Sequence, residues 1–215
     1  MKRIPAAEHT SRPWRIHEIV PDFKLEDVWE LPGRGGPGGF PELVELITSF
    51  DPAQTPSRTS RALWATRSKV GTLLGWDDPE DGLGSRVATV YDRLPPDLVR
   101  RGRGPDFAAL PFTPLYLTND EFAAEIANKT VHGVMHLSVI EEEPDSYRAQ
   151  MAVLVRPNGC LGTAYMAAIK PFRAIIYPAM AKYGRELWER RDDSHVRDAE
   201  ASPADLEDRE PAAAC

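Results

Sequence analysis

The sequence predicts one α+β domain in which a curved antiparallel sheet wraps around a long, kinked C-terminal helix. Four strand-like segments between residues 112 and 156 are separated only by short connections. Connections this short force neighbouring strands into antiparallel hairpins. From Leu161 to Trp188 the apolar residues then recur at helical spacing, and Pro171 and Pro178 interrupt that helix. Proline removes a helical hydrogen bond and crowds the preceding turn, so we expect kinks that follow a curved sheet.

The last two predicted strands alternate apolar and polar residues. The predicted strands of this part of the chain are 112–118, 121–127, 130–140 and 146–156. Odd positions such as Met135 and Met151 are apolar, whereas even positions include His132 and His136. We call the two sides of the sheet the odd face and the even face after this numbering. We expect the odd face to pack on the core and the even face to meet solvent.

The N-terminal half is less regular. Residues 1–21 contain three prolines and no sustained period, which predicts an irregular arm. A first strand is expected over residues 23–31, followed by a glycine-rich turn at 33–39. Two helices are then predicted at 40–50 and 59–74.

A long connection over residues 77–111 separates these helices from the main sheet. It is rich in Asp, Gly, Pro and Arg, and it holds one short apolar stretch, Val87 to Leu94, that we interpret as a brief strand. Long connections inside a compact domain tend to be functional or mobile, so this segment is a candidate lid.

Charge is concentrated at the C-terminus. The formal net charge is −7, and residues 192–215 carry most of it, so a disordered acidic tail is predicted there and the domain at 22–191 is near neutral. A near-neutral domain lacks the basic balance of a nucleic-acid binder. Lysine and arginine residues interrupt the most apolar stretch, 159–183, so no membrane span is expected. No signal peptide is evident and there are only two cysteines, which favours the cytoplasm.

The histidines do not indicate a metal site. His132 and His136 lie on one strand face about 13 Å apart, too far for two bonds of about 2 Å to one zinc ion. We expect no cofactor. The solvent-facing interpretation is favoured over a catalytic base, although His136 stays a weak candidate. His9, His17 and His195 are given no role.

Asp27 is the other weak catalytic candidate, because it falls on the otherwise apolar phase of the first strand. A buried, unpaired carboxyl group would have a raised pKa suited to acid–base catalysis. The alternatives are a structural hydrogen bond or a β-bulge that returns Asp27 to solvent, and these are favoured.

Adaptable apolar residues predict a ligand pocket between the sheet and the C-terminal helix. Methionine and aromatic side chains on the expected inner faces could serve as ordinary core or as the wall of a cavity. The candidate pocket residues are Trp29, Tyr116, Met135, Met151, Tyr165, Met166 and Phe172.

The order of elements resembles the helix-grip architecture of START-like and polyketide-cyclase-like proteins. Several motifs are more specific and resemble the bacterial domain-of-unknown-function family 2867. These are HTSRPW (9–14), DVW (27–29), TVHGVMHL (130–137), RAQMAVLVRPNG (148–159) and GTAYMAAIKPFR (162–173). The resemblance covers about residues 9–190 and implies no particular catalytic residues. Similar domains accompany short-chain oxidoreductases, so it implies work on small organic metabolites.

The sequence supports three hypotheses about function. The leading hypothesis is a cytosolic module that binds a small hydrophobic or aromatic metabolite. The second is an enzyme, such as a cyclase, dehydratase or hydrolase, with Asp27 as the acid or base. The third is a non-catalytic interaction protein that forms a homodimer through the polar sheet face.

Overall fold

A computed structural model provides the structure, which describes residues 2–31, 39–51, 87–128, 130–143 and 146–159 and the single positions 65, 83, 162 and 166. In chain order the helices are α1 (Ala6–Thr10), α2 (Arg15–Ile19), α3 (Phe40–Thr48), the 3₁₀ helix η4 (Val90–Arg93) and α5 (Pro96–Arg101). The strands are β1 (Lys24–Glu30), β2 (Thr113–Leu117), β3 (Glu121–Ala127), β4 (Val131–Glu143) and β5 (Ser146–Pro157).

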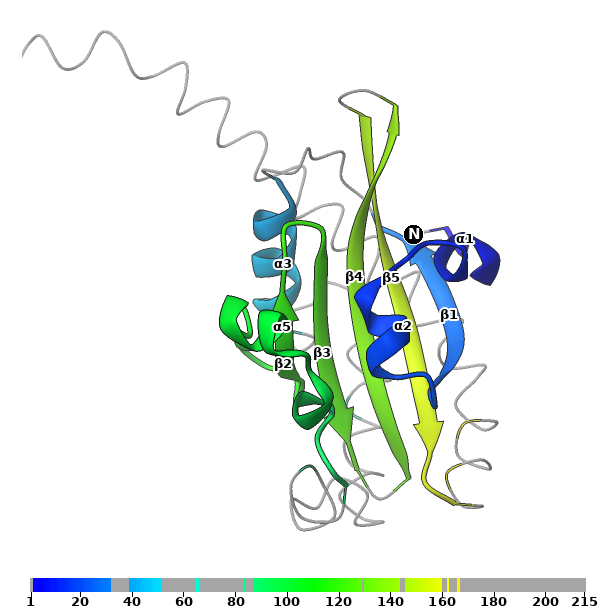
Figure 1. The fold of residues 1–215 in the computed structure, drawn as a ribbon, viewed down its shortest axis with the longest axis vertical. Coiled ribbons are helices and arrows are strands. Elements are labelled where there is room, and N and C mark those ends of the chain that lie inside the picture. The colour runs from blue at the N-terminus through cyan, green and yellow to red at the C-terminus, as the bar shows by residue number, and fades with distance from the viewer. Residues whose placement is uncertain are drawn as a thin grey trace, which may run out of the picture.

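The five strands form one open antiparallel sheet in the order β1-β5-β4-β3-β2. The strands β4 and β5 make a long twisted hairpin that extends beyond the other strands (Figure 1). Every predicted strand of the 112–156 segment is confirmed within a few residues, and so is the antiparallel pairing. Helix α3 confirms the predicted helix at 40–50.

The odd face is a hydrophobic core, as predicted. Met135, Leu137 and Met151 are buried there together with Trp29 from β1 and several apolar residues of α3. The residues of α3 in this cluster are Phe40, Leu43 and Val44. The helical spacing of these three side chains places them on one side of α3, which therefore packs against the sheet.

The even face is also buried, so the prediction that it meets solvent is wrong. The side chains of His132 and His136 are 0% exposed. Helices α1, α2 and α5 lie on this side of the sheet (Figure 1). A second hydrophobic cluster forms beneath them and includes Ile16, Val90 and Leu98.

The N-terminal arm, which the sequence predicts to be irregular, contains two short helices. Residues Ala6–Thr10 and Arg15–Ile19 form α1 and α2, each five residues long. Residues 2–4 also extend the sheet beside β1, since the backbone N–H of Ile4 donates to Val28 O at 3.0 Å. Helices this short are marginal alone, so their helicity depends on packing against the sheet.

The brief strand expected between Val87 and Leu94 is likewise wrong. This stretch forms η4, whose N-terminus is capped by the Thr89 hydroxyl, which accepts the backbone N–H of Tyr91 at 3.1 Å. Helix α5 follows at a pair of prolines, a favoured start for a helix. Val90 and Leu98 are buried on the even face, so residues 90–101 contribute to the core. A lid formed by the other residues of the 77–111 connection stays a prediction.

A β-bulge occurs in β1 next to Asp27. Leu25 pairs with Leu154 but Asp27 pairs with Val153, so one residue of β1 is extra. The bulge is one of the predicted alternatives, but it does not return Asp27 to solvent. Asp27 is 8% exposed, and Arg3 Nη2 lies 2.8 Å from its carboxylate.

Several expectations lie outside the described residues. These are the glycine-rich turn at 33–38, most of the helix at 59–74, the tail at 192–215 and, apart from Gly162 and Met166, the C-terminal helix with Pro171 and Pro178. Within the part of the chain that the structure describes, no helix is long and apolar enough to cross a membrane.

Candidate functional site

Two buried glutamate–histidine pairs lie on the even face. His136 Nε2 is 3.0 Å from Glu121 Oε2, and His132 Nε2 is 2.8 Å from Glu125 Oε2. The glutamates belong to β3 and the histidines to β4. The strands are in a register that places Glu121 opposite Ser138 and Glu125 opposite Val134. Each glutamate therefore meets its histidine diagonally across the two strands.

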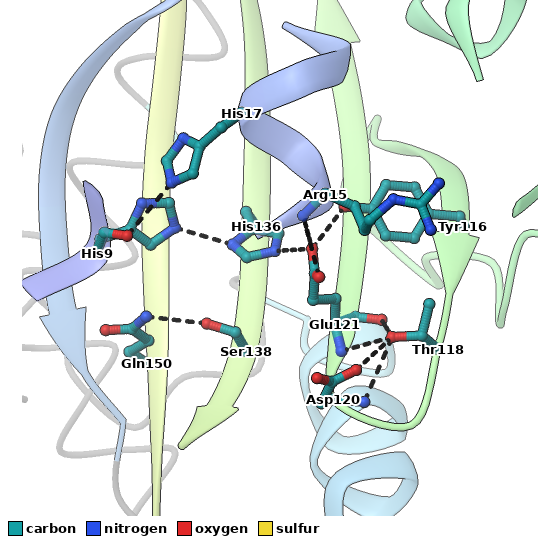
Figure 2. A network of polar contacts seen from close by, with 10 residues as sticks. All are labelled: His9, Arg15, His17, Tyr116, Thr118, Asp120, Glu121, His136, Ser138 and Gln150. Carbon is teal, nitrogen blue, oxygen red and sulfur yellow. Dashed lines mark hydrogen bonds and ion pairs between the residues drawn. The ribbon is translucent and has the colours of Figure 1, made fainter. Parts of the chain in front are cut away.

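Glu121 accepts three kinds of donor (Figure 2). The backbone N–H of Arg15 lies 3.1 Å from both carboxylate oxygens, and the Tyr116 hydroxyl donates to Oε2 at 3.0 Å. His136 is the third donor. Burial alone would raise the pKa of Glu121, but the hydrogen bonds from His136, Arg15 and Tyr116 outweigh it and hold the pKa below its ordinary value. Glu121 is therefore a carboxylate at neutral pH.

Glu125 repeats the pattern one step along β3. It accepts the Thr89 hydroxyl and the backbone N–H of Val90, the latter at 3.0 Å. Burial would raise the pKa of Glu125, but hydrogen bonds from His132, Thr89 and Val90 lower it overall. Val90 is the first residue of η4, just as Arg15 is the first residue of α2. Each carboxylate thus caps a covering helix by accepting an N–H that has no partner inside that helix.

A second histidine extends the first pair. His9 Nε2, from α1, lies 3.0 Å from His136 Nδ1 (Figure 2). Burial and the neighbouring His136 and His17 lower the pKa of His9 from 6.5 to about 3. Burial also lowers the pKa of His136, although Glu121 acts to raise it. Both imidazoles are consequently neutral at pH 7.

The hydrogen bonds that link His9, His136 and Glu121 all run in one direction, from donor to acceptor toward Glu121. Because Glu121 is an acceptor, His136 Nε2 must carry the proton, and a neutral His136 therefore accepts at Nδ1. His9 must then donate through Nε2, which leaves its Nδ1 as an acceptor. A neutral imidazole with a free Nδ1 lone pair can accept a hydrogen bond from a hydroxyl group. The lowered pKa of His9 makes it a weak base at neutral pH.

Further contacts attach the N-terminal arm to the sheet. Arg148 Nη2 lies 2.9 Å from Glu8 of α1, and Arg15 pairs with Asp97 of α5 at 2.8 Å. The imidazole of His17 is 3.3 Å from the backbone oxygen of His9. Such partly exposed ion pairs contribute little individually, so the buried hydrogen bonds of Glu121 and His136 are the principal polar anchor of the arm.

The structure separates the predicted pocket residues. Trp29, Met135 and Met151 lie together on the odd face. Tyr116 lies on the opposite, even face, where its hydroxyl contacts Glu121. Met166 is half-buried. Tyr165 and Phe172 are outside the described residues.

Of the catalytic candidates, His136 lies in the buried polar chain and Asp27 does not. Sequence reasoning missed Glu121, Glu125 and His9. A usable signal was present, because Glu121 and Glu125 have the same four-residue spacing on β3 as His132 and His136 have on β4. In the described ranges no group of three or more His, Cys, Asp or Glu side chains is arranged to hold a metal ion.

The fold and this site define a class of mixed α+β proteins whose five-stranded antiparallel sheet is buried on both faces. The family model described as Protein of unknown function (DUF2867) matches residues 19–180. The chain therefore belongs to that family, as its motifs indicate. No curated protein and no solved structure matches the chain significantly.

Proposed function

We propose that the protein binds a small hydrophobic or aromatic metabolite against the odd face of its sheet. One observation carries the proposal: Trp29, Met151 and Leu137 are direct neighbours across β1, β5 and β4, and Met135 lies beside them. An unbranched thioether side chain can adopt many shapes, so methionines next to a tryptophan make an adaptable apolar wall. A wall of this kind accommodates ligands of varied outline.

The C-terminal helix would form the other wall in the helix-grip arrangement that the sequence predicts. Tyr165, Met166 and Phe172 are then expected to face Met135 and Met151 across the ligand. Ligand sites of this kind are mostly apolar with few polar groups. The low cysteine count supports action in a reducing compartment such as the cytoplasm.

Methionine methyl NMR tests the binding proposal. The protein has five methionines, and two of them, Met135 and Met151, belong to the proposed wall. With ¹³C-methyl labels, titration with indole or 1-naphthol is expected to shift the Met135 and Met151 signals. A ring current from a bound aromatic probe acts only on nearby methyl groups, so the shift reports location as well as binding.

Single substitutions Met135→Leu and Met151→Leu assign the signals and keep the volume of the core nearly constant. Met151→Ala should alter probe affinity, whereas Thr48→Val, a buried change on α3 away from β5, should not. The proposal is wrong if a panel of neutral apolar probes leaves both methyl signals in place.

The two other hypotheses stay predictions. Asp27 as an acid or base requires that Asp27→Asn abolish turnover, and the carboxylate already has Arg3 at 2.8 Å as a partner. Dimerisation through the even face has less support, because the described helices α1, α2 and α5 already cover that face. Light scattering measures the oligomeric state directly.

A further inference from the structure

Residues 5–20 form a segment across the even face that is attached to β1 at both ends, and we call this segment the strap. Before the strap, the backbone N–H of Ile4 donates to Val28 O of β1 at 3.0 Å. After the strap, a short turn leads directly into β1 at Lys24. Helices α1 and α2 make up most of the strap, and they cover β4 and β5 (Figure 1). The strap can therefore lift from the even face without breaking any strand pairing.

The buried polar contacts between the strap and the strands centre on one histidine pair. His9 Nε2 of the strap lies 3.0 Å from His136 Nδ1 of β4, and both side chains are 0% exposed. The ring of Trp14, also in the strap, has its centroid 5.8 Å from that of His136. On its other side His136 contacts Glu121, which accepts the first N–H of α2. One buried row of three groups thus holds both helices of the strap (Figure 2).

The contact between the two histidines requires one ring nitrogen without a hydrogen. In the neutral pair His136 Nδ1 is that nitrogen and His9 donates to it. One added proton can be accommodated, because a charged His136 can donate both to Glu121 and to His9 in its other tautomer. Two added protons cannot, because two N–H groups would then face each other. Two positive rings would also lie with their centroids 5.1 Å apart in a buried site.

The charges around the pair can balance one added proton but not two. Glu121 is the buried carboxylate in contact with His136, and Glu8 is already paired with Arg148 at 2.9 Å. Burial holds the pKa of His9 at about 3 and lowers the pKa of His136. The titratable and charged groups near the two rings are Glu8 of α1, Arg12, Arg15 and His17 of the following residues, Tyr116 of β2, Asp120 and Glu121 at the start of β3, and Arg148 of β5.

We propose that the strap is a pH-sensitive cover, and that protonation of both His9 and His136 releases residues 5–20 from the even face while the five-stranded sheet stays folded. Release is a local unfolding of a segment that both of its ends keep beside β1. It exposes His136 and Glu121, which the closed strap buries. The proposal concerns the even face, so it does not depend on the apolar site proposed for the odd face.

Backbone amide exchange measured by NMR at pH 6.5 and pH 4.5 tests this proposal. The readout is the protection factor, which is corrected for the effect of pH on the exchange chemistry. The strap is reported by the amides of Ser11 and Val20, which donate to Ala7 O and Ile16 O, and the sheet by amides of β4 and β5. Each histidine that gains a proton on opening lowers strap protection by up to about tenfold per pH unit below 6.5. Two histidines therefore lower it by up to about 10⁴-fold over this range, while the strand amides stay more protected than the strap at both pH values.

Two matched substitutions identify the groups that sense pH. His9→Gln removes one titrating ring and keeps an amide donor near the position of Nε2, so the fall in strap protection should shrink to at most about 100-fold. His132→Gln makes the same change in the neighbouring glutamate–histidine pair. His132 contacts Glu125 and Phe23, which lie outside the strap. This control should therefore keep the full fall seen in the wild type.

Three results would overturn the proposal. The first is equal protection of strap and strand amides at pH 4.5, because the whole domain would then open together. The second is a wild-type strap protection that changes by less than about threefold between the two pH values. The third is a fall in His9→Gln as large as that in the wild type. The first two results need only the wild-type protein, so they decide the matter even if a variant fails to fold.

Discussion

Replacing Glu121 by leucine is expected to lower the free energy of unfolding by about 4 kcal/mol. The leucine removes the only carboxylate that accepts from His136, from the Tyr116 hydroxyl and from the backbone N–H of Arg15 in the described structure. Each buried donor left without an acceptor costs roughly 1–3 kcal/mol, and hydrophobic burial of the leucine offsets part of the loss. Urea unfolding at pH 7 measures the change.

Hydrogen exchange tells whether this loss is local to the arm. In Glu121→Leu the backbone amides of α1 and α2 should exchange much faster, because the capped N-terminus of α2 loses its acceptor. The matched variant Glu125→Leu should instead expose η4, whose first N–H it caps. The control Asp120→Asn changes an exposed neighbour and should alter stability by less than about 0.5 kcal/mol. Equal exchange in α1, α2 and η4 for both leucine variants would contradict separate anchoring.

Acidification is expected to destabilise the protein well above the pH at which carboxylates titrate. The pKa of His9 is lowered from 6.5 to about 3, and burial lowers the pKa of His136 too. Between about pH 6.5 and pH 3 the unfolded chain therefore binds protons that the folded protein does not. Stability is fully present above this window and is lost as pH falls through it, at up to about 1.4 kcal/mol per pH unit for each imidazole.

The lowered pKa values of Glu121 and Glu125 act in the same direction at lower pH. These carboxylates stabilise the fold above their ordinary pKa of 4.5 and lose that contribution when they are protonated. The free energy of unfolding therefore decreases throughout as the pH falls from 6.5. The histidines cause the decrease at the higher pH values of this range, and the two glutamates add to it at lower pH.

Urea unfolding at pH 7, 6 and 5 measures this dependence. His9→Gln removes one titrating imidazole, so the slope between pH 6 and pH 5 should decrease by about 1.4 kcal/mol per unit. Ser138→Ala removes a polar group from the same face without a titrating proton and should leave the slope unchanged. A wild-type stability that is flat from pH 7 to pH 5 would contradict the lowered pKa values of His9 and His136, because it would show that the folded and unfolded states bind the same number of protons in this range.

The strands and their pairing were predictable because the signals are local. Alternation in 130–140 and 146–156 defines two strand faces, and the short turns between segments leave only antiparallel neighbours. Helix 40–50 was predictable for the same reason, since its apolar residues recur within two turns. A bulge beside Asp27 was one of the favoured explanations for a residue on the wrong phase, and the register of β1 with β5 contains it, although Asp27 stays buried.

The candidate site was not predictable in the same way. A histidine on a strand has the same local pattern whether it meets water or a glutamate, and His136 is buried only because α1 and α2 return to cover it. That return involves contacts between residues more than a hundred positions apart, such as His9 with His136 and Arg15 with Glu121. The short helices gave weak local signals because they depend on this packing.

By itself, the sequence determined the strands, their antiparallel order along the chain and the apolar odd face, because each follows from side-chain period and connection length. Only the tertiary structure decided that the even face is also an interior. A buried carboxylate and imidazole are stable only when donors and acceptors from other segments satisfy them, and the helices that begin at Arg15 and Val90 supply those groups to Glu121 and Glu125.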